Sequence, residues 1–223
     1  MIRDAYVIAA KDLRIELRSR TALSQLAPFV VLVAVLFGFA LNADRTVLTE
    51  AASGLYWITV LFAAVLAIGR SFSIEVDDSV IDMLRLSDLE PPSIFAGKAA
   101  ALAVQLVAIQ LILIAAVVIL YDARIEDPLL FIAAAVAATV GVAAAGTLYG
   151  VLVAGLRMRE TLLPILLLPV LAPVLISATR AFDDALGNAA VNGWSWCGLL
   201  AALAVFYGVF GGWAFGALME ESR

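Results

Sequence analysis

Ionisable side chains divide the chain into charged segments and long charge-free stretches. A helix that rises about 1.5 Å per residue needs roughly 20 apolar residues to cross a hydrocarbon core of about 30 Å. Six stretches without Asp, Glu, Lys or Arg approach or exceed this length: 21–43, 51–69, 99–121, 128–156, 161–179 and 185–219. The pattern predicts an all-α membrane protein with six transmembrane helices, near residues 22–41, 51–69, 99–120, 129–155, 162–178 and 196–218.

Composition strengthens this interpretation. Of the 223 residues, 64% are hydrophobic and 15% are charged, whereas about 25% of residues are charged in an average soluble domain. A soluble protein of this size needs a polar surface, which so few charges cannot supply. Lipid is therefore the solvent expected for most of the chain.

The positions of Lys and Arg predict the orientation. Assigning alternate loops to opposite sides of the membrane puts eleven of the 14 basic residues on one side. Because cytoplasmic loops carry the excess of Lys and Arg, both termini are expected in the cytoplasm. The larger group is Arg3, Lys11, Arg14, Arg18, Arg20, Arg70, Arg85, Lys98, Arg157, Arg159 and Arg223, and the smaller is Arg45, Arg124 and Arg180.

The first 21 residues have the pattern of an amphipathic helix. An apolar stripe falls near one helical face, and most charges lie on the other; the stripe comprises Ile2, Tyr6, Ala9, Leu13 and Leu17. This pattern favours a helix in the cytoplasmic interface, although a solvated tail is the alternative. The expected organisation is an interfacial helix at 1–21, a six-helix domain at 22–219 and a short cytoplasmic tail at 220–223.

Several kinds of chemistry are missing. The chain has no His and a single cysteine, Cys197, which excludes His-based catalytic pairs, His ligands to haem or metals, and an intrachain disulfide. We expect Cys197 to be a packed apolar residue. No phosphate-binding loop of the Gly-x-x-x-x-Gly-Lys-Ser/Thr type occurs, and no charge lies inside the predicted crossings. Energy for any uphill transport is therefore expected from another subunit.

Residues 70–98 form the largest predicted cytoplasmic segment. It carries six acidic residues, together with Ile74, Ile81 and Leu84 at near-helical spacing. Pro91 and Pro92 would end a helix there. The segment therefore predicts a short amphipathic helix between the second and third crossings, whose apolar face is covered by a cytoplasmic partner, by the membrane surface or by neighbouring helices.

Three other features concern the crossings. Small residues in the fourth and sixth predict close helix packing, or else a transport path: Gly141, Ala145, Gly146, Gly150, Gly208, Gly211, Gly212 and Gly216. Pro164, Pro169 and Pro173 predict a kinked fifth helix at an interface. Residues 179–195 predict a short outer interfacial or re-entrant helix, with a stop at Gly187-Asn188 and interfacial tryptophans at 194 and 196.

Three segments carry a resemblance to a known family: KDLRIELRSR at 11–20, EVDDSVIDMLRLS at 75–87 and GLRMRETLLPILLLPVLAPVLISA at 155–178. With six crossings, the chain resembles the haem exporter protein B family, the B component of cytochrome c maturation and an ABC-2-type permease. It departs from the family at Ser79 and Asp88, where Gly and Pro are usual. Both departures affect the geometry of the 70–98 segment.

The resemblance implies a non-catalytic permease subunit in the bacterial inner membrane. Two copies would join two ATP-binding subunits and the C and D membrane components, and ATP hydrolysis on the partner would release a haem-loaded periplasmic chaperone. A coupling helix at about 73–88 would dock on the ATPase through Ile74, Glu75, Asp77, Asp78, Ile81, Asp82, Leu84 and Arg85.

No cofactor is expected on this chain itself, since ATP belongs to the partner and haem to a partner or to the transported cargo. Lacking His, the subunit is expected to transmit motion without ligating haem iron. The alternatives are a generic ABC-2 exporter subunit for lipid, polysaccharide or drug, and a purely structural membrane subunit. An intramembrane enzyme is the weakest of the alternatives.

Overall fold

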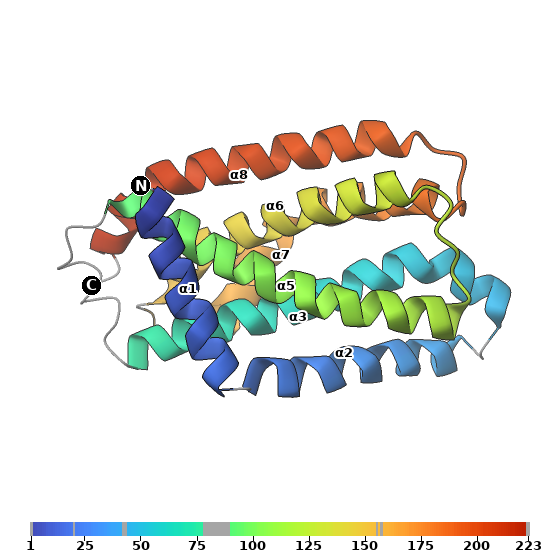
Figure 1. Ribbon diagram of the computed structural model, residues 1–223, viewed down its shortest axis with the longest axis horizontal. Coiled ribbons are helices and arrows are strands. Elements are labelled where there is room, and N and C mark those ends of the chain that lie inside the picture. Colours follow the sequence, from blue (N-terminus) through green and yellow to red (C-terminus); the bar gives the residue numbers. More distant parts are fainter. Residues whose placement is uncertain are drawn as a thin grey trace.

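The computed structural model describes residues 2–19, 21–41, 44–77, 90–154, 156 and 158–221. Within these ranges the chain is helical and has no strand (Figure 1). The helices are α1 (Ile2–Ser19), α2 (Thr21–Ala40), α3 (Arg45–Asp77), α5 (Pro91–Tyr121), α6 (Pro128–Ala154), α7 (Arg159–Ala185) and α8 (Gly193–Glu221).

The long helices run along one axis, and α1 lies steeply across one end of the bundle (Figure 1). Helix α1 begins and α8 ends at this end, which we call the terminal end. The connections from α2 to α3, α5 to α6 and α7 to α8 lie at the opposite end, which we call the hairpin end. The two predicted groups of loops thus lie at opposite ends of the bundle.

The length and apolar composition of the helices are those of a membrane protein. Five of them, α3 and α5 to α8, are long and apolar enough to span a bilayer. The remaining predicted crossing, the first in the chain, coincides with the 20-residue α2, of which Gln25–Ala40 is a shorter apolar helix. The all-helical membrane fold is confirmed, and the count of six crossings stays a prediction.

Several helices extend beyond the predicted crossings. Helix α3 continues from the predicted end at residue 69 to Asp77, and α5 begins at Pro91 rather than 99. A proline is well suited to the first turn, where its missing N–H would have no helical partner. Both ends of the predicted segment 70–98 therefore belong to helices of the bundle. Helix α8 likewise continues to Glu221, into the predicted tail.

The predicted short outer helix is wrong. Residues 179–185 continue α7, and the chain then turns at Gly187, which has a φ of 69°, before α8 begins. The helix continues because Ala181, Phe182 and Ala185 extend its buried stripe. Its acidic residues also have partners, since Ser53 donates a hydrogen bond to the Asp183 carboxylate. The predicted stop at Gly187 is confirmed.

Glycines allow the close contacts predicted for the fourth and sixth crossings. A Cβ atom on Gly146 would clash with Ile68, one on Gly150 with Phe72, and one on Gly211 with Phe95. Gly208 has no neighbour within 4 Å of a built Cβ atom. The packing interpretation is therefore confirmed for α6 and for part of α8.

Candidate functional site

The predicted docking residues lie around the end of α3. Ile74, Glu75 and Asp77 belong to its last turns, and the structure describes no side chains there. The other predicted docking residues lie outside the described residues: Asp78, Ile81, Asp82, Leu84 and Arg85. The described part of this region is therefore the pair of helix ends that lead into 78–89, together with what packs on them.

Helix α1 packs closely on the start of α5. A Cβ atom on Gly97 would lie 2.6 Å from the Ala5 carbonyl oxygen and 2.7 Å from Ile8 Cβ. Ile8 is 3% exposed. Glycine at 97 thus allows the two helices to approach at a distance that no other residue permits without a shift of backbone. The predicted N-terminal helix is confirmed, but its contact with the bundle uses Ile8, which lies off the predicted apolar stripe.

A charged cluster lies at this crossing, and its Lys98 side chain is buried. Lys98 is 6% exposed, and its Nζ lies 3.7 Å from Asp12 Oδ2 and 5.4 Å from the centre of the Phe72 ring. Lys11 Nζ lies 2.8 Å from the other Asp12 oxygen. The cluster joins α1, α3 and α5. The Asp12 carboxylate and the face of the Phe72 ring both compensate the cost of removing the Lys98 ammonium from water. We call these residues, Lys11, Asp12, Phe72 and Lys98, the charged junction.

The charged junction connects to the rest of the bundle through aromatic side chains. Phe72 occupies the space left by Gly150 of α6. Phe95 fills the space at Gly211 of α8, and its ring centre lies 5.6 Å from that of Phe215. Displacement of the α3 or α5 end would therefore push directly on α1, α6 and α8.

Sequence reasoning missed the charged junction. In the sequence, Lys98 contributes only to the prediction of membrane orientation, and Asp12 only to the polar face of the N-terminal helix. Nothing in their spacing links two residues so far apart in the chain. The available signal is a lysine embedded in an otherwise apolar helix start, because a buried cation needs a compensating partner.

The prolines of α7 lie mostly on its outer side. Pro169 and Pro173 are exposed and Pro164 is half-buried. Near them, the Tyr207 hydroxyl of α8 donates a hydrogen bond of 2.8 Å to the Val170 carbonyl, three residues before Pro173. A proline removes one backbone donor and disturbs the bonds of the preceding turn. Tyr207 therefore supplies a donor where the helix is weakened.

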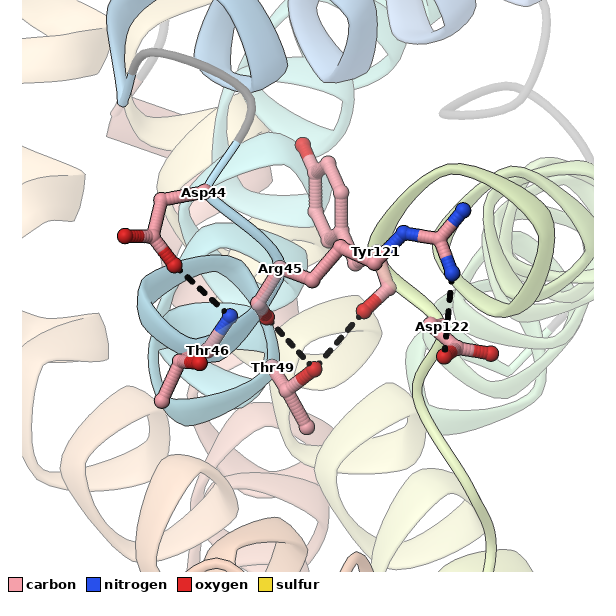
Figure 2. Close-up of polar contacts among 6 residues, drawn as sticks. All are labelled: Asp44, Arg45, Thr46, Thr49, Tyr121 and Asp122. Atoms are coloured by element: carbon pink, nitrogen blue, oxygen red, sulfur yellow. Dashed lines mark hydrogen bonds and ion pairs between the residues drawn. The ribbon is translucent and has the colours of Figure 1, made fainter.

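The hairpin end is tied together by hydrogen bonds (Figure 2). The Asp44 carboxylate accepts a 2.9 Å hydrogen bond from the Thr46 N–H and so caps the N-terminus of α3. The Thr49 hydroxyl contacts two carbonyl oxygens, of Arg45 at 2.8 Å and of Tyr121 at 2.9 Å. Arg45 lies 3.8 Å from Asp122. The start of α3 is thereby fixed to the end of α5.

The last connection joins the same network. The Asn188 side-chain amide donates to the Thr49 carbonyl at 2.7 Å, and the backbone N–H groups of Glu126 and Asp127 donate to the Ala185 carbonyl at 2.9 and 3.1 Å. The start of α3, the α5–α6 connection, and the end of α7 with its connection to α8 are therefore linked by hydrogen bonds at the hairpin end.

A cleft of about 560 Å³ lies between α3 and α7 near the hairpin end. Its wall includes Ser53 and Asp183, whose side chains are hydrogen-bonded, and Arg180, whose guanidinium lies 3.6 Å from Asp183. Much of the remaining wall is apolar, with Trp57, Ile58 and Ile176. The cleft is amphipathic; Asp183 and Arg180 pair with each other, and Glu50 adds a second carboxylate to the wall.

Comparison with known proteins identifies the family. The sequence matches the family described as CcmB protein over residues 3–222. The chain belongs to the CcmB family. The match extends from α1 to the last residues of α8, so it includes the charged junction, the 78–89 segment and the α7 prolines.

Three relatives of this CcmB-family chain carry the name heme exporter protein B. The Rhodobacter capsulatus protein is 27% identical over 179 residues, covering 76% of this chain and 78% of the relative. The Haemophilus influenzae protein is 28% identical, with 80% of each chain covered. The Paracoccus denitrificans protein is 26% identical, with 77% and 78% covered. The resemblance found in the sequence is thereby confirmed.

Cys197 lies at the start of α8 in this CcmB-family chain and is 8% exposed. Its neighbour Trp196 packs on the apolar core. The expectation that Cys197 is a packed residue is confirmed by this burial.

Proposed function

We propose that this chain is the permease subunit of an ABC transporter that acts in haem export during cytochrome c maturation. The observation that carries the proposal is the CcmB-family match over residues 3–222, joined by three relatives named heme exporter protein B. The transporter resides in the bacterial inner membrane, and the terminal end of the bundle faces the cytoplasm, where most Lys and Arg lie.

The ATP-binding subunit docks on residues of about 73–88 in this proposal. Two features support that placement. Helices α3 and α5 flank this segment and continue without interruption into the bundle. The charged junction lies within a few residues of both helix ends and joins them to α1. A rotation of the docked segment would thus reach α1, α6 and α8 through packed side chains.

The complex contains two copies of this chain, two ATPase subunits, the C and D membrane components and the periplasmic haem chaperone. ATP hydrolysis on the partner moves the permease, and this motion releases the haem-loaded chaperone at the hairpin end. The α7 prolines support a helix that bends or meets a second copy, since a proline-weakened helix needs neighbours to satisfy its backbone. This chain is itself not the catalyst.

Haem iron is not ligated by this subunit in our proposal. The absence of His supports it, because His is a common axial ligand, and the lone Cys197 is buried. Purified subunit mixed with equimolar haem is expected to give the spectrum of unligated haem in detergent. A ligated-haem spectrum that is lost in Cys197→Ala would overturn this part of the proposal.

Deletion of the gene tests the function as a whole. We expect the deletion strain to lose covalently haem-stained c-type cytochromes and to regain them with the plasmid-borne chain. Intact cytochromes c in the deletion strain would instead favour a generic ABC-2 exporter of lipid, polysaccharide or drug. Failure of any ATPase to co-purify with the functional chain would favour a structural subunit.

A further inference from the structure

Helix α1 presents three different faces. One, with Ile8 and Asp12, packs on α5. Three of the five residues of the predicted apolar stripe point away from the protein, since Ile2 is 89%, Tyr6 74% and Leu17 67% exposed, whereas Ala9 and Leu13 are partly buried. At about 100° per residue, Arg14 and Arg18 fall roughly 80–120° around the helix from Ile8, on a third side that is turned away from both the bundle contact and the apolar stripe. The packing on α5 therefore fixes which way the other two faces point.

A groove of about 420 Å³ lies along that outer side. Tyr6, Lys11, Arg14 and Arg18 are among its walls, and none of the described residues that line it is acidic. Of the two nearest carboxylates in sequence, Asp12 is engaged with Lys11 and Lys98, and Glu16 does not line the groove. The groove is therefore a local site of positive charge beside an apolar stripe.

Arg14 and Arg18 have no counter-charge among the residues that the structure describes. Both are exposed, and neither makes an ion pair with another described residue. They are four residues apart on one helical face, where like charges repel and destabilise a helix. An anion from outside the chain would remove this repulsion.

We infer that the groove on α1 binds the headgroup of an anionic phospholipid, whose acyl chains lie along the exposed apolar stripe. A lipid satisfies both faces at once, whereas a soluble anion would leave the stripe uncovered. The position of α1 across the end of a membrane-spanning bundle puts it at headgroup depth (Figure 1), and Tyr6 is an amphipathic aromatic suited to that depth. The inference does not depend on the transported cargo.

This contact would give α1 a fixed point in the leaflet. Because α1 also carries Asp12 of the charged junction, a lipid held by Arg14 and Arg18 braces the start of α5 against the membrane. Motion arriving from 78–89 would then act against an anchored helix.

Native mass spectrometry of the full-length chain in detergent tests the inference. The protein is titrated with phosphatidylglycerol and, separately, with phosphatidylcholine. We expect the wild type to retain phosphatidylglycerol preferentially and the double variant Arg14→Gln/Arg18→Gln to lose about fivefold in apparent affinity for each charge removed. Arg14→Lys/Arg18→Lys keeps the charge and is expected to keep most of the preference.

Two controls decide the outcome. Arg45→Gln/Arg124→Gln removes the same charge at the hairpin end and should leave phosphatidylglycerol retention unchanged. Glycerol 3-phosphate, a soluble headgroup, should not displace the lipid at equal concentration. Unchanged retention in the Arg14/Arg18 variant that still elutes as a folded species, an equal loss in the hairpin-end control, or full displacement by glycerol 3-phosphate would each overturn the assignment.

Discussion

The two ends of the bundle are built on different principles. At the hairpin end, helix ends and connections are hydrogen-bonded to one another through Thr49, Asn188 and the Ala185 carbonyl. At the terminal end, α1 crosses the bundle and one charged junction joins it to α3 and α5. The hairpin end therefore resists relative motion of helices, whereas the terminal end concentrates coupling in a few side chains. Such an arrangement suits a subunit that receives force at the terminal end.

The largest effect is expected from breaking the charged junction. Lys98→Ala removes the buried ammonium that joins α5 to Asp12 of α1. Removal of one member of a buried ion pair destabilises by about 3 kcal/mol at the low end of the range, which applies here because Lys11 still contacts Asp12. Unfolding in mixed SDS and detergent micelles measures the loss. The double variant Lys98→Met/Asp12→Leu should recover much of the stability. Additive losses in the double variant would mean that the two residues do not interact.

A smaller effect is expected from separating α1 and α5. Gly97→Ala puts a Cβ atom against the Ala5 carbonyl and Ile8, and such overpacking costs about 1–3 kcal/mol. Gly54→Ala is the matched control, because nothing lies within 4 Å of a Cβ atom there, and Ala is preferred over Gly in helices. We expect the same unfolding assay to show destabilisation for the first and none for the second. Equal effects would contradict the close crossing.

The smallest effect is expected at the hairpin end. Thr49→Val removes the hydroxyl that links the Arg45 and Tyr121 carbonyls, at a cost of about 0.5–1 kcal/mol, because other ties remain. Thr46→Val is the control, since only its backbone N–H bonds to Asp44. Hydrogen exchange of the α5 C-terminal turn should rise in Thr49→Val alone. A loss of stability as large as that of Lys98→Ala would contradict the proposed difference between the ends.

Much of the fold could be predicted from local sequence. Charge-free stretches marked the helices, and Gly146 and Gly150 marked close packing. The continuation of α7 to Ala185 could not be predicted locally, because it places Asp183 in a buried position where its carboxylate accepts a hydrogen bond from Ser53, a residue distant in sequence. The same holds for Lys98, whose burial depends on Asp12 and Phe72. Local patterns report apolar faces, whereas the partner of a buried charge is set by tertiary packing.

The most direct test of the account is co-purification of the ATP-binding subunit with tagged, full-length chain. Charge reversal by Asp77→Lys/Asp78→Lys alters the proposed docking segment, whereas Glu90→Lys reverses an exposed charge just before α5. We predict that the first variant inserts normally but recovers much less ATPase, and that the second recovers as much as the wild type. Unchanged recovery in Asp77→Lys/Asp78→Lys would contradict the proposed coupling.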